Sequence, residues 1–405
     1  MPSATVSPAQ IIAAISSLSL TLPPLIDSKW LPPSAKKREI SCSELFITPT
    51  VLAVEEIQLE KNSLDLNYLS DLYYGKVENF NELPPAVRLF TKNGLQFKNS
   101  NINSIKLNFL FVNNFTYSNT EKDNQYAQND INTVEPMLTI KFNENRSKAM
   151  FNMNFARSID GHSNWFTQRI SQIYVSHDIT PNQTILLGQG SRLPSSVDGK
   201  VSIFNREMVI KSQLGRNFGD ARSVGIRNIA NYKFLEYDIG LYDSTRYMEH
   251  FGNGLDFTGH IIIKPFENLP ENIGRLKFGA GYNIGHNNFS YNMYSFYARY
   301  DYKKFHIQTE YANADGYNGL AESNNKAQGF YTMAYYDITP KLSIIARYDV
   351  FDEDKNISNN KSTEYSAGFT YKMFKNLHFL LNFVRRNIEN KPDSNMILFA
   401  TRFII

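Results

Sequence analysis

The sequence lacks the features of a disulfide-stabilised protein and of a helical membrane protein. Its 405 residues include a single cysteine, Cys42, so a framework of disulfide bonds cannot form within the chain. No stretch reaches the roughly 18 consecutive apolar residues that a membrane-spanning helix requires, because Asn, Lys, Asp or Ser interrupts each apolar run after a few residues. We therefore expect neither a disulfide scaffold nor a bundle of transmembrane helices.

A strong excess of one charge is also missing. The formal net charge is +3 and the densest basic block is Lys36-Lys37-Arg38, which is too little for a nucleic-acid-binding protein. The seven histidines show no metal-ligand spacing such as His-Glu-x-x-His, and no Ser-His-Asp arrangement can be identified. We expect no nucleic-acid partner, no metal site, no cofactor and no enzymatic activity.

Aromatic residues and short alternating segments are abundant. Phe, Tyr and Trp make up 14% of the chain, with 24 Tyr and 29 Phe, and they could supply the aromatic girdles of a membrane β-barrel. From Ser104 onward the dominant period is two, which places successive side chains on opposite faces of a strand. In residues 234–243 the alternating sets are Leu235, Tyr237, Ile239 and Leu241 against Glu236, Asp238 and Gly240.

About sixteen segments of this kind occur in the sequence, and the even number suits a bacterial barrel. Most have nearly the ~9 to 11 residues that a tilted strand needs to cross a bilayer. We predict strands near residues 104–118, 136–144, 148–157, 168–178, 183–190, 222–230, 233–243, 255–266, 274–285, 290–302, 305–312, 328–337, 342–351, 363–373, 377–387 and 395–405. The expected fold is all-β, a 16-stranded antiparallel transmembrane β-barrel.

The connections between these segments tend to alternate in length, as periplasmic turns and extracellular loops do. We predict short turns at residues 143–148, 178–183, 231–233, 302–304, 338–341 and 374–376. We predict long polar loops at residues 118–133, 313–326, 352–362 and 387–395. The connection 286–289 is an exception, because it is short where the alternation requires a long loop.

The strand pattern alone also fits a soluble β-sandwich, which would bury its apolar faces inside. Loop lengths, strand count and the chain end favour the barrel. The last strand carries Ile397, Phe399, Thr401, Phe403 and Ile405 on one face, which resembles the C-terminal strand of outer-membrane proteins, with Ile405 in place of the usual Phe.

One connection, of about thirty residues from Ser191 to Ala221, is too long to have no role in a compact domain. Its apolar residues are too many for a segment in water: Leu193, Val197, Val201, Ile203, Phe204, Met208, Val209, Ile210 and Leu214. We hypothesise that this segment folds into the barrel and narrows the lumen, as a constriction loop does.

Two strands and their turn resemble a known family. The strand Ile173-Tyr174-Val175-Ser176-His177 turns at Asp178-Ile179-Thr180-Pro181 and returns to Gly188-Gln189-Gly190-Ser191-Arg192-Leu193-Pro194. A later echo is Tyr335-Tyr336-Asp337-Ile338-Thr339-Pro340, followed by Ala346-Arg347-Tyr348-Asp349. Over roughly residues 88–405 the chain is similar to the phosphate-selective porin O and P family. The resemblance implies a sixteen-stranded outer-membrane channel, usually trimeric, that passes anions such as phosphate or polyphosphate.

Selectivity in such a channel depends on charged side chains in the lumen, where Arg and Lys attract phosphate. The long connection has six basic residues in or beside it, Arg192, Lys200, Arg206, Lys211, Arg216 and Arg222, against Asp198, Glu207 and Asp220. Our candidate pore-lining and anion-binding residues are Arg192, Arg206, Lys211, Arg216, Arg222, Arg227, Arg275, Lys277, Arg299 and Arg347. Of these, Arg206, Arg216, Arg222 and Arg227 are expected at the narrowest point. In the alternative interpretation, these cations pair with wall carboxylates and only hold the loop in place.

We divide the chain into a leader (1–53), a periplasmic lead-in (54–103) and the barrel (104–405). Within the leader, the basic block at Lys36 followed by the apolar residues up to Ala53 resembles an export signal. In this interpretation residues 1–35 arise from an upstream start codon. The alternatives are a signal at 11–26, without a preceding basic residue, and a Pro- and Ser-rich tail.

The sequence therefore predicts an outer-membrane porin for passive diffusion of small solutes, with a preference for anions such as phosphate. Its expected partners are outer-membrane lipid, small anionic solutes and two further copies in a homotrimer. A non-transport barrel with a structural or enzymatic role remains the alternative. Sixteen strands favour the channel, because barrels of that size enclose water whereas those of about 8 strands are filled by side chains.

Overall fold

The computed structural model describes residues 89, 95–97, 101–120, 125–156, 169–192, 198, 201–219, 221–246, 252 and 254–405, without the side chains of Ser191, Arg192 and Glu271. Every described residue belongs to one compact unit, Asn62–Ile405. The predicted leader, Lys200 and Asp220 lie outside the described residues.

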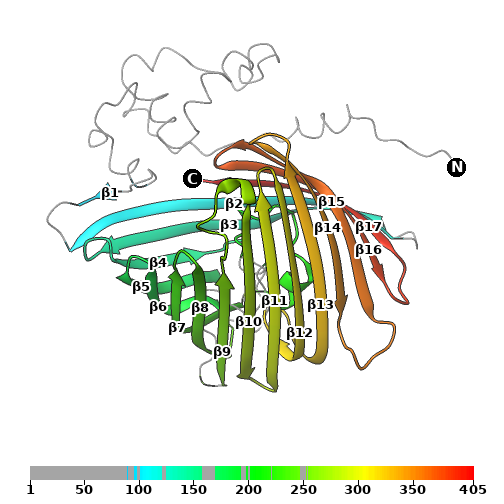
Figure 1. The fold of residues 1–405 in the computed structure, drawn as a ribbon, viewed down its shortest axis with the longest axis horizontal. Helices are drawn as coiled ribbons and strands as arrows, with labels where there is room; N and C mark the ends of the chain where they lie inside the picture. The colour runs from blue at the N-terminus through cyan, green and yellow to red at the C-terminus, as the bar shows by residue number, and fades with distance from the viewer. Residues whose placement is uncertain are drawn as a thin grey trace, which may run out of the picture. The chain divides into compact units, whose positions relative to one another are not determined.

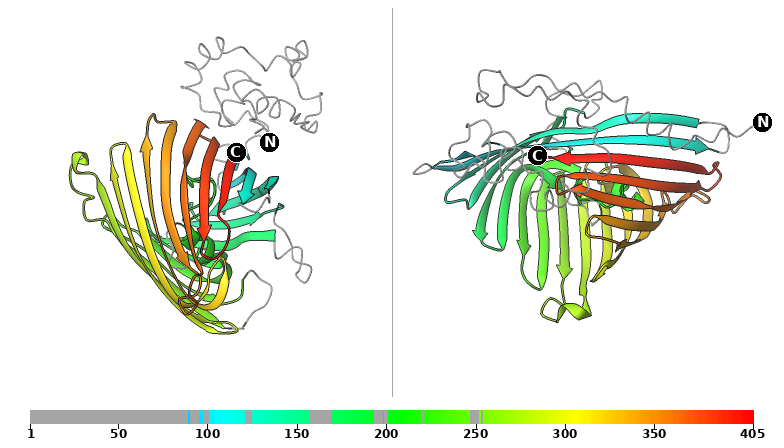
Figure 2. Two further views of the ribbon diagram at one scale, coloured as in Figure 1. Left: turned by 90° about the vertical axis from the view of Figure 1, so that its right-hand side faces the viewer. Right: turned by 90° about the horizontal axis from the view of Figure 1, so that it is seen from above.

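Sixteen antiparallel strands form a closed barrel (Figure 1). Each strand pairs with the next along the chain, and the last pairs with the first, as Phe399 with Phe115. The cyan and red ends of the sheet accordingly run side by side (Figure 2). The strands are β2 (Ile102–Thr120), β3 (Gln125–Phe142), β4 (Ser147–Met153), β5 (Ile170–Thr180), β6 (Gln183–Arg192), β7 (Ala221–Asn231), β8 (Leu235–Asp243), β9 (Leu255–Ile263), β10 (Arg275–His286), β11 (Ser290–Tyr302), β12 (Phe305–Asn318), β13 (Glu322–Asp337), β14 (Leu342–Asp352), β15 (Lys361–Phe374), β16 (Leu377–Ile388) and β17 (Ser394–Ile404).

Three short elements complete the described structure. The two-residue strand β1 (Leu95–Gln96), in the predicted lead-in, pairs with Ile105 and Ser104 of β2. A helix, α7 (Gln213–Asn217), lies in the connection between β6 and β7, and a 3-10 turn, η5 (Glu271–Ile273), precedes β10. Among the described residues, no helix combines the length and the hydropathy needed to cross a bilayer.

Each predicted strand corresponds to one observed strand, but two of the predicted long loops are wrong in extent. Strand β2 continues to Thr120 and strand β3 begins at Gln125, so most of 118–133 is strand. Likewise β12 and β13 occupy most of 313–326. Residues 125–132 are all exposed, and a strand with water on both sides pairs through its backbone without any alternation of side chains. The polar residues in these two segments therefore show where the apolar outer surface ends, and the strands continue beyond that point.

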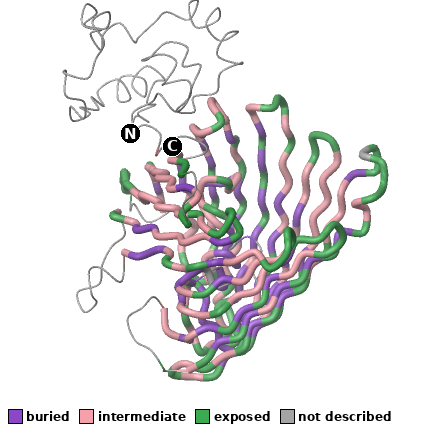
Figure 3. The backbone as a smooth tube through the Cα atoms, turned by 90° about the vertical axis from the view of Figure 1, so that its left-hand side faces the viewer, coloured by how far each residue is buried: buried purple, intermediate pink, exposed green. Residues whose placement is uncertain are grey.

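The barrel is apolar outside, as the alternation predicted. In β11, Phe296 is 58% exposed whereas its neighbours Ser295 and Tyr297 are buried. The same order occurs in β15, where Tyr365 is 54% exposed between buried Glu364 and Ser366. Buried and exposed residues alternate along many of the strands (Figure 3). An apolar outer surface of this extent, on a sheet without free edges, is stable in lipid. The chain therefore has the architecture of a transmembrane β-barrel.

The two ends of the barrel differ in their connections. The end at which β2 begins and β17 ends, here the turn end, has tight connections at 143–146, 181–182, 232–234, 303–304, 338–341 and 375–376. Its exception is 264–274, which contains η5. At the opposite, loop end, connections range from the short 287–289 and 319–321 to the long 193–220. The predicted short turns and the short connection near residue 288 are confirmed.

Candidate functional site

The connection between β6 and β7 folds into the barrel. Its residues Met208, Leu214 and Phe218 are at most 1% exposed and join a cluster with inward-facing side chains of β11 to β14. The cluster members on the wall are Met293, Ala312, Ala314, Tyr317, Ala327, Tyr331, Met333, Ile345 and Phe351. A second cluster packs Val209 against Leu380, Val384, Met396, Leu398 and Ala400 of β16 and β17. The predicted inward-folded loop is confirmed, and it is attached to one side of the lumen.

The loop has its own internal cap. Ser212 precedes α7, and its Oγ accepts a hydrogen bond from the backbone N of Gly215 at 3.0 Å, as an N-cap residue does. The carboxylate of Asp198 in turn accepts from the backbone N and the Oγ of Ser212, at 2.6 and 2.7 Å. The backbone N of Asp198 donates to Glu310 of β12 at 3.3 Å. These bonds fix the start of α7 against the barrel wall.

A buried group of charges holds the other side of α7. The backbone N of Gln213 donates to Asp349 of β14 at 2.7 Å, and Arg216 donates to Glu364 of β15 at 2.7 Å. Arg347 lies 3.4 Å from Asp349, and Arg386 donates to the same Glu364 oxygen at 2.5 Å. Asp349 and Glu364 are 0% exposed, so each needs these partners to remain charged without a large desolvation cost.

Two wall arginines bind the loop backbone directly. Arg347 donates to the carbonyl oxygens of Ile210 and Lys211, at 3.1 and 3.2 Å. Arg402 of β17 donates to the carbonyls of Arg206 and Met208, the latter at 2.7 Å. Both arginines are nearly inaccessible to solvent. The path of the loop from residue 206 to 211 is therefore fixed by the wall.

Beside the loop, toward β2 to β5, the barrel interior contains a cavity of about 440 Å³. The loop contributes Val201, Ser202, Ile203, Phe204, Arg206 and Lys211. The wall contributes Leu110, Thr133, Glu135, Met137, Asn152, Asn154, Ser171, Gln172, Arg222 and Ile404. Among these described lining residues, three are cationic and Glu135 is the only carboxylate. The described lining of this cavity thus has an excess of positive charge.

Three of the ten predicted site residues, Arg206, Lys211 and Arg222, meet at this cavity. Arg216 and Arg347 belong to the buried group around Glu364 instead, which is the arrangement expected in the alternative interpretation. Only the backbone of Arg192 is described, and it pairs with Ala221. The loop therefore has both kinds of cation, some that anchor it and some that line the cavity.

The remaining four predicted residues point inward elsewhere on the wall, in local contacts. Arg227 donates to both carboxylate oxygens of Asp238, at 2.7 and 2.5 Å. Lys277 lies 3.4 Å from Glu236, and Arg299 donates to Asp301 at 2.8 Å. Arg275 donates to the backbone carbonyls of Phe266 and Leu269 in the β9–β10 connection.

The sequence did not single out Glu135 or Phe204 as site residues. Glu135 lies between the outward Val134 and Pro136, so alternation predicts only that it faces the lumen. The sequence marks Phe204 only as one apolar residue of the loop. It stacks on His378 of β16 with ring centroids 4.4 Å apart, a contact between residues distant in the sequence.

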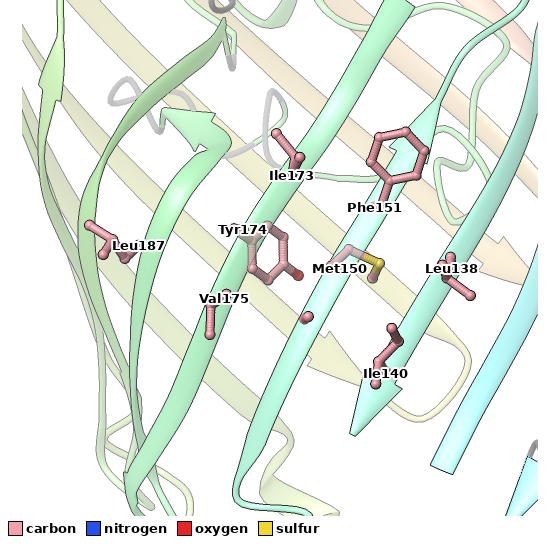
Figure 4. A pocket seen from close by; sticks show the side chains of 9 residues that line it. Leu138, Ile140, Met150, Phe151, Ile173, Tyr174, Val175 and Leu187 are labelled. Carbon is pink, nitrogen blue, oxygen red and sulfur yellow. The ribbon is translucent and has the colours of Figure 1, made fainter. Parts of the chain in front are cut away.

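A further hollow, of about 300 Å³, lies on the barrel wall and extends across strands β3 to β6 (Figure 4). Outward-facing Leu138, Ile140, Ile173, Val175 and Leu187 line it together with Phe151. Leu187 is 63% exposed, so this part of the hollow faces the lipid. Lipid acyl chains suffice to fill such an apolar depression. Among the described residues, no group of three or more His, Cys, Asp or Glu side chains is arranged to bind a metal ion.

Comparison with known proteins supports the fold and the resemblance. Residues 274–397 match the family model described as phosphate-selective porin O and P, so the predicted resemblance is confirmed in that part of the chain. No curated protein matches the chain in sequence.

The barrel is similar to solved outer-membrane channels. The anion-selective porin from Comamonas acidovorans has a TM-score of 0.55 at 11% identity, over 75% of this chain and 99% of that one. The outer membrane channel DcaP of Acinetobacter baumannii has a TM-score of 0.52 at 16% identity, over 77% of this chain and 99% of that one. A loop-deletion mutant of OmpT of Vibrio cholerae has a TM-score of 0.53 at 11% identity, over 75% and 99%. These likenesses confirm the sixteen-stranded porin barrel. Together with the family match, they support an outer-membrane channel and point away from an enzyme.

Proposed function

We propose that this chain is a porin through which small solutes diffuse passively, with a preference for anions such as phosphate that is set at the loop cavity. The observation that carries the proposal is the convergence of Arg206, Lys211 and Arg222 on one cavity with a single described carboxylate, Glu135. Cationic side chains around a narrow, low-dielectric passage raise the local concentration of anions and lower that of cations.

Several of the other predicted cations, in the loop and on the wall, are closer to charge balance. On the anchored side, Arg216, Arg347 and Arg386 face Asp349 and Glu364, so most of their charge is balanced there. Arg227 and Arg299 are balanced by Asp238 and Asp301 on the wall. Among the described residues that line the cavity, three cations face one carboxylate, which is a larger excess than on the anchored side. The family description, which names phosphate, and the anion-selective Comamonas porin are consistent with the same preference.

Planar-bilayer recording in a KCl gradient tests the proposal. We expect a reversal potential of the sign that marks anion preference. The double variant Lys211→Gln/Arg222→Gln is expected to shift it toward the cation side. A matched control is Arg385→Gln, which removes a charge that is paired with Asp393 at the loop end and 56% exposed. Cation preference in the unaltered protein would overturn the proposal. Failure of the protein to swell liposomes would favour the non-transport alternative.

We also propose, from the resemblance alone, that the barrel assembles as a homotrimer. Native mass spectrometry in detergent tests this, and a monomer alone would contradict it. The division into a leader of 1–53 and a lead-in of 54–103 is likewise a proposal. Mass spectrometry of the N-terminus of membrane-extracted protein tests it, because an intact Met1 would contradict export by cleavage.

A further inference from the structure

We infer that the loop cavity prefers organic anions that carry an apolar body, such as aromatic monocarboxylates, over inorganic phosphate. This inference rests on the proposed anion preference and adds the substrate class. The volume of the loop cavity, about 440 Å³, lies in the range of small-molecule sites. The lining combines cationic side chains, which attract the carboxylate, with an apolar surface, which contacts the ring.

The apolar surface comes from both sides of the cavity. The loop contributes Val201, Ile203 and Phe204, and the wall contributes Leu110, Met137 and Ile404. An aromatic ring that leaves water for such a surface gains hydrophobic stabilisation. A phosphate ion gains nothing from it and loses part of its hydration. The apolar lining therefore separates two anions that the cations alone would both attract.

These loop residues differ from the apolar loop residues that only pack. Met208, Leu214 and Phe218 are at most 1% exposed and belong to the cluster on β11 to β14. Val201, Ile203 and Phe204 are only partly buried and line open space. An apolar side chain that is left facing a wet cavity is available to contact a ligand.

The lining is also held in place before any solute arrives. The ring of Phe204 stacks on His378, and the carbonyl of Arg206 accepts from Arg402. The carbonyl of Lys211 accepts from Arg216 at 2.9 Å as well as from Arg347. A ligand that contacts this surface does not need to order the loop, which lowers the entropic cost of binding.

The test is block of the chloride current through the full-length protein in planar bilayers by added benzoate, formate or phosphate. Benzoate and formate have the same charged group and differ in the apolar body. We expect benzoate to reduce the current at concentrations about tenfold lower than formate or phosphate, as burial of one such group predicts. The double variant Val201→Thr/Ile203→Thr makes this lining more polar, and threonine has nearly the shape of valine and is one methylene smaller than isoleucine. It should bring the benzoate and formate curves together.

Thr133→Val is the matched opposite change, since Thr133 lines the same cavity and valine has nearly its shape. It is expected to move the benzoate curve to lower concentration. Equal block by benzoate, formate and phosphate in a channel that still prefers anions in a KCl gradient would overturn this inference alone. Cation preference in the gradient would overturn the proposed function as well. An unchanged benzoate preference in the double variant would show that ring size, and not the apolar lining, causes the block.

Discussion

The backbone amide of Gln213 and the carboxylate of Asp349 form a 2.7 Å hydrogen bond between residues 136 positions apart. Gln213 begins α7 inside the barrel, and Asp349 is a fully buried residue of β14. An acidic group beside the start of a helix accepts from amides that have no partner within the helix. The bond joins the loop to the wall, so contacts of this type hold the loop in place inside the barrel.

Glu364→Gln tests these contacts. Arg216, Arg347 and Arg386 all lie within 4 Å of the Glu364 carboxylate, and the glutamine would leave three guanidinium groups with less negative charge in a buried place. Breaking a buried charge cluster in this way costs about 3 kcal/mol. We expect the loop to detach part of the time and the single-channel conductance to rise and become noisier. Asp315→Asn, an exposed partner of Lys326, is the control and should leave the conductance unchanged. A quiet channel of unaltered conductance in Glu364→Gln would contradict the anchoring role.

Gly329→Val tests the apolar side of the same attachment. A Cβ atom at Gly329 would lie 2.5 Å from Leu214 Cδ2 and 2.9 Å from Phe351, both closer than such atoms approach. Since Phe351 belongs to the wall, we expect α7 to move and the conductance to rise. The barrel itself should still resist unfolding in detergent. At Gly259 a Cβ would meet nothing nearer than 3.5 Å, so Gly259→Ala should behave like the unaltered protein. Equal conductance in both variants would show that the loop yields without opening the lumen.

Phe296→Lys tests which face of the barrel meets lipid. Phe296 is an outward residue of β11, and a lysine within the lipid-facing surface of a barrel costs about 2–4 kcal/mol near the bilayer midplane. We expect reduced assembly in vesicles, measured as the fraction that remains resistant to SDS without heating. Asn292→Lys, on the same face of β11 nearer the loop end, should cost much less. Loss of assembly in Asn292→Lys to the same degree would contradict this depth dependence.

The strands could be predicted because lipid imposes a strict rule on them. A residue such as Phe278 or Ile344 must be apolar if it faces acyl chains, and its neighbours face the lumen, so the period of two is visible in the sequence. That rule ends where the strand leaves the membrane. Residues 125–132 have no apolar face, and the extension of β3 therefore could not be predicted.

The inward fold of the loop could be predicted from its apolar residues, but its attachment could not. Arg216 and Arg222 are close in the sequence and look equivalent, yet Arg216 binds Glu364 and Arg222 lines the cavity. Arg216 lies near the end of α7, whereas Arg222 lies at the start of β7 on the wall. Four wall residues determine where the loop attaches: Asp349, Glu364, Arg347 and Arg402. The period of two in the sequence indicates only that these are polar residues that face the lumen. Their role in holding the loop depends on contacts between residues that are far apart in the sequence.

The most direct measurement places a thiol in the loop cavity. Ser202 lines the cavity and is exposed, so Ser202→Cys, combined with Cys42→Ser to remove the native thiol, makes one reactive site there. Single-channel recording before and after modification by a negatively charged methanethiosulfonate reagent should show a lower conductance and a shift toward cation preference, and a positively charged reagent should lower the conductance without that shift. If both modified proteins conduct and select as before, ions do not pass through this cavity, and the loop cations cannot set the preference of the channel.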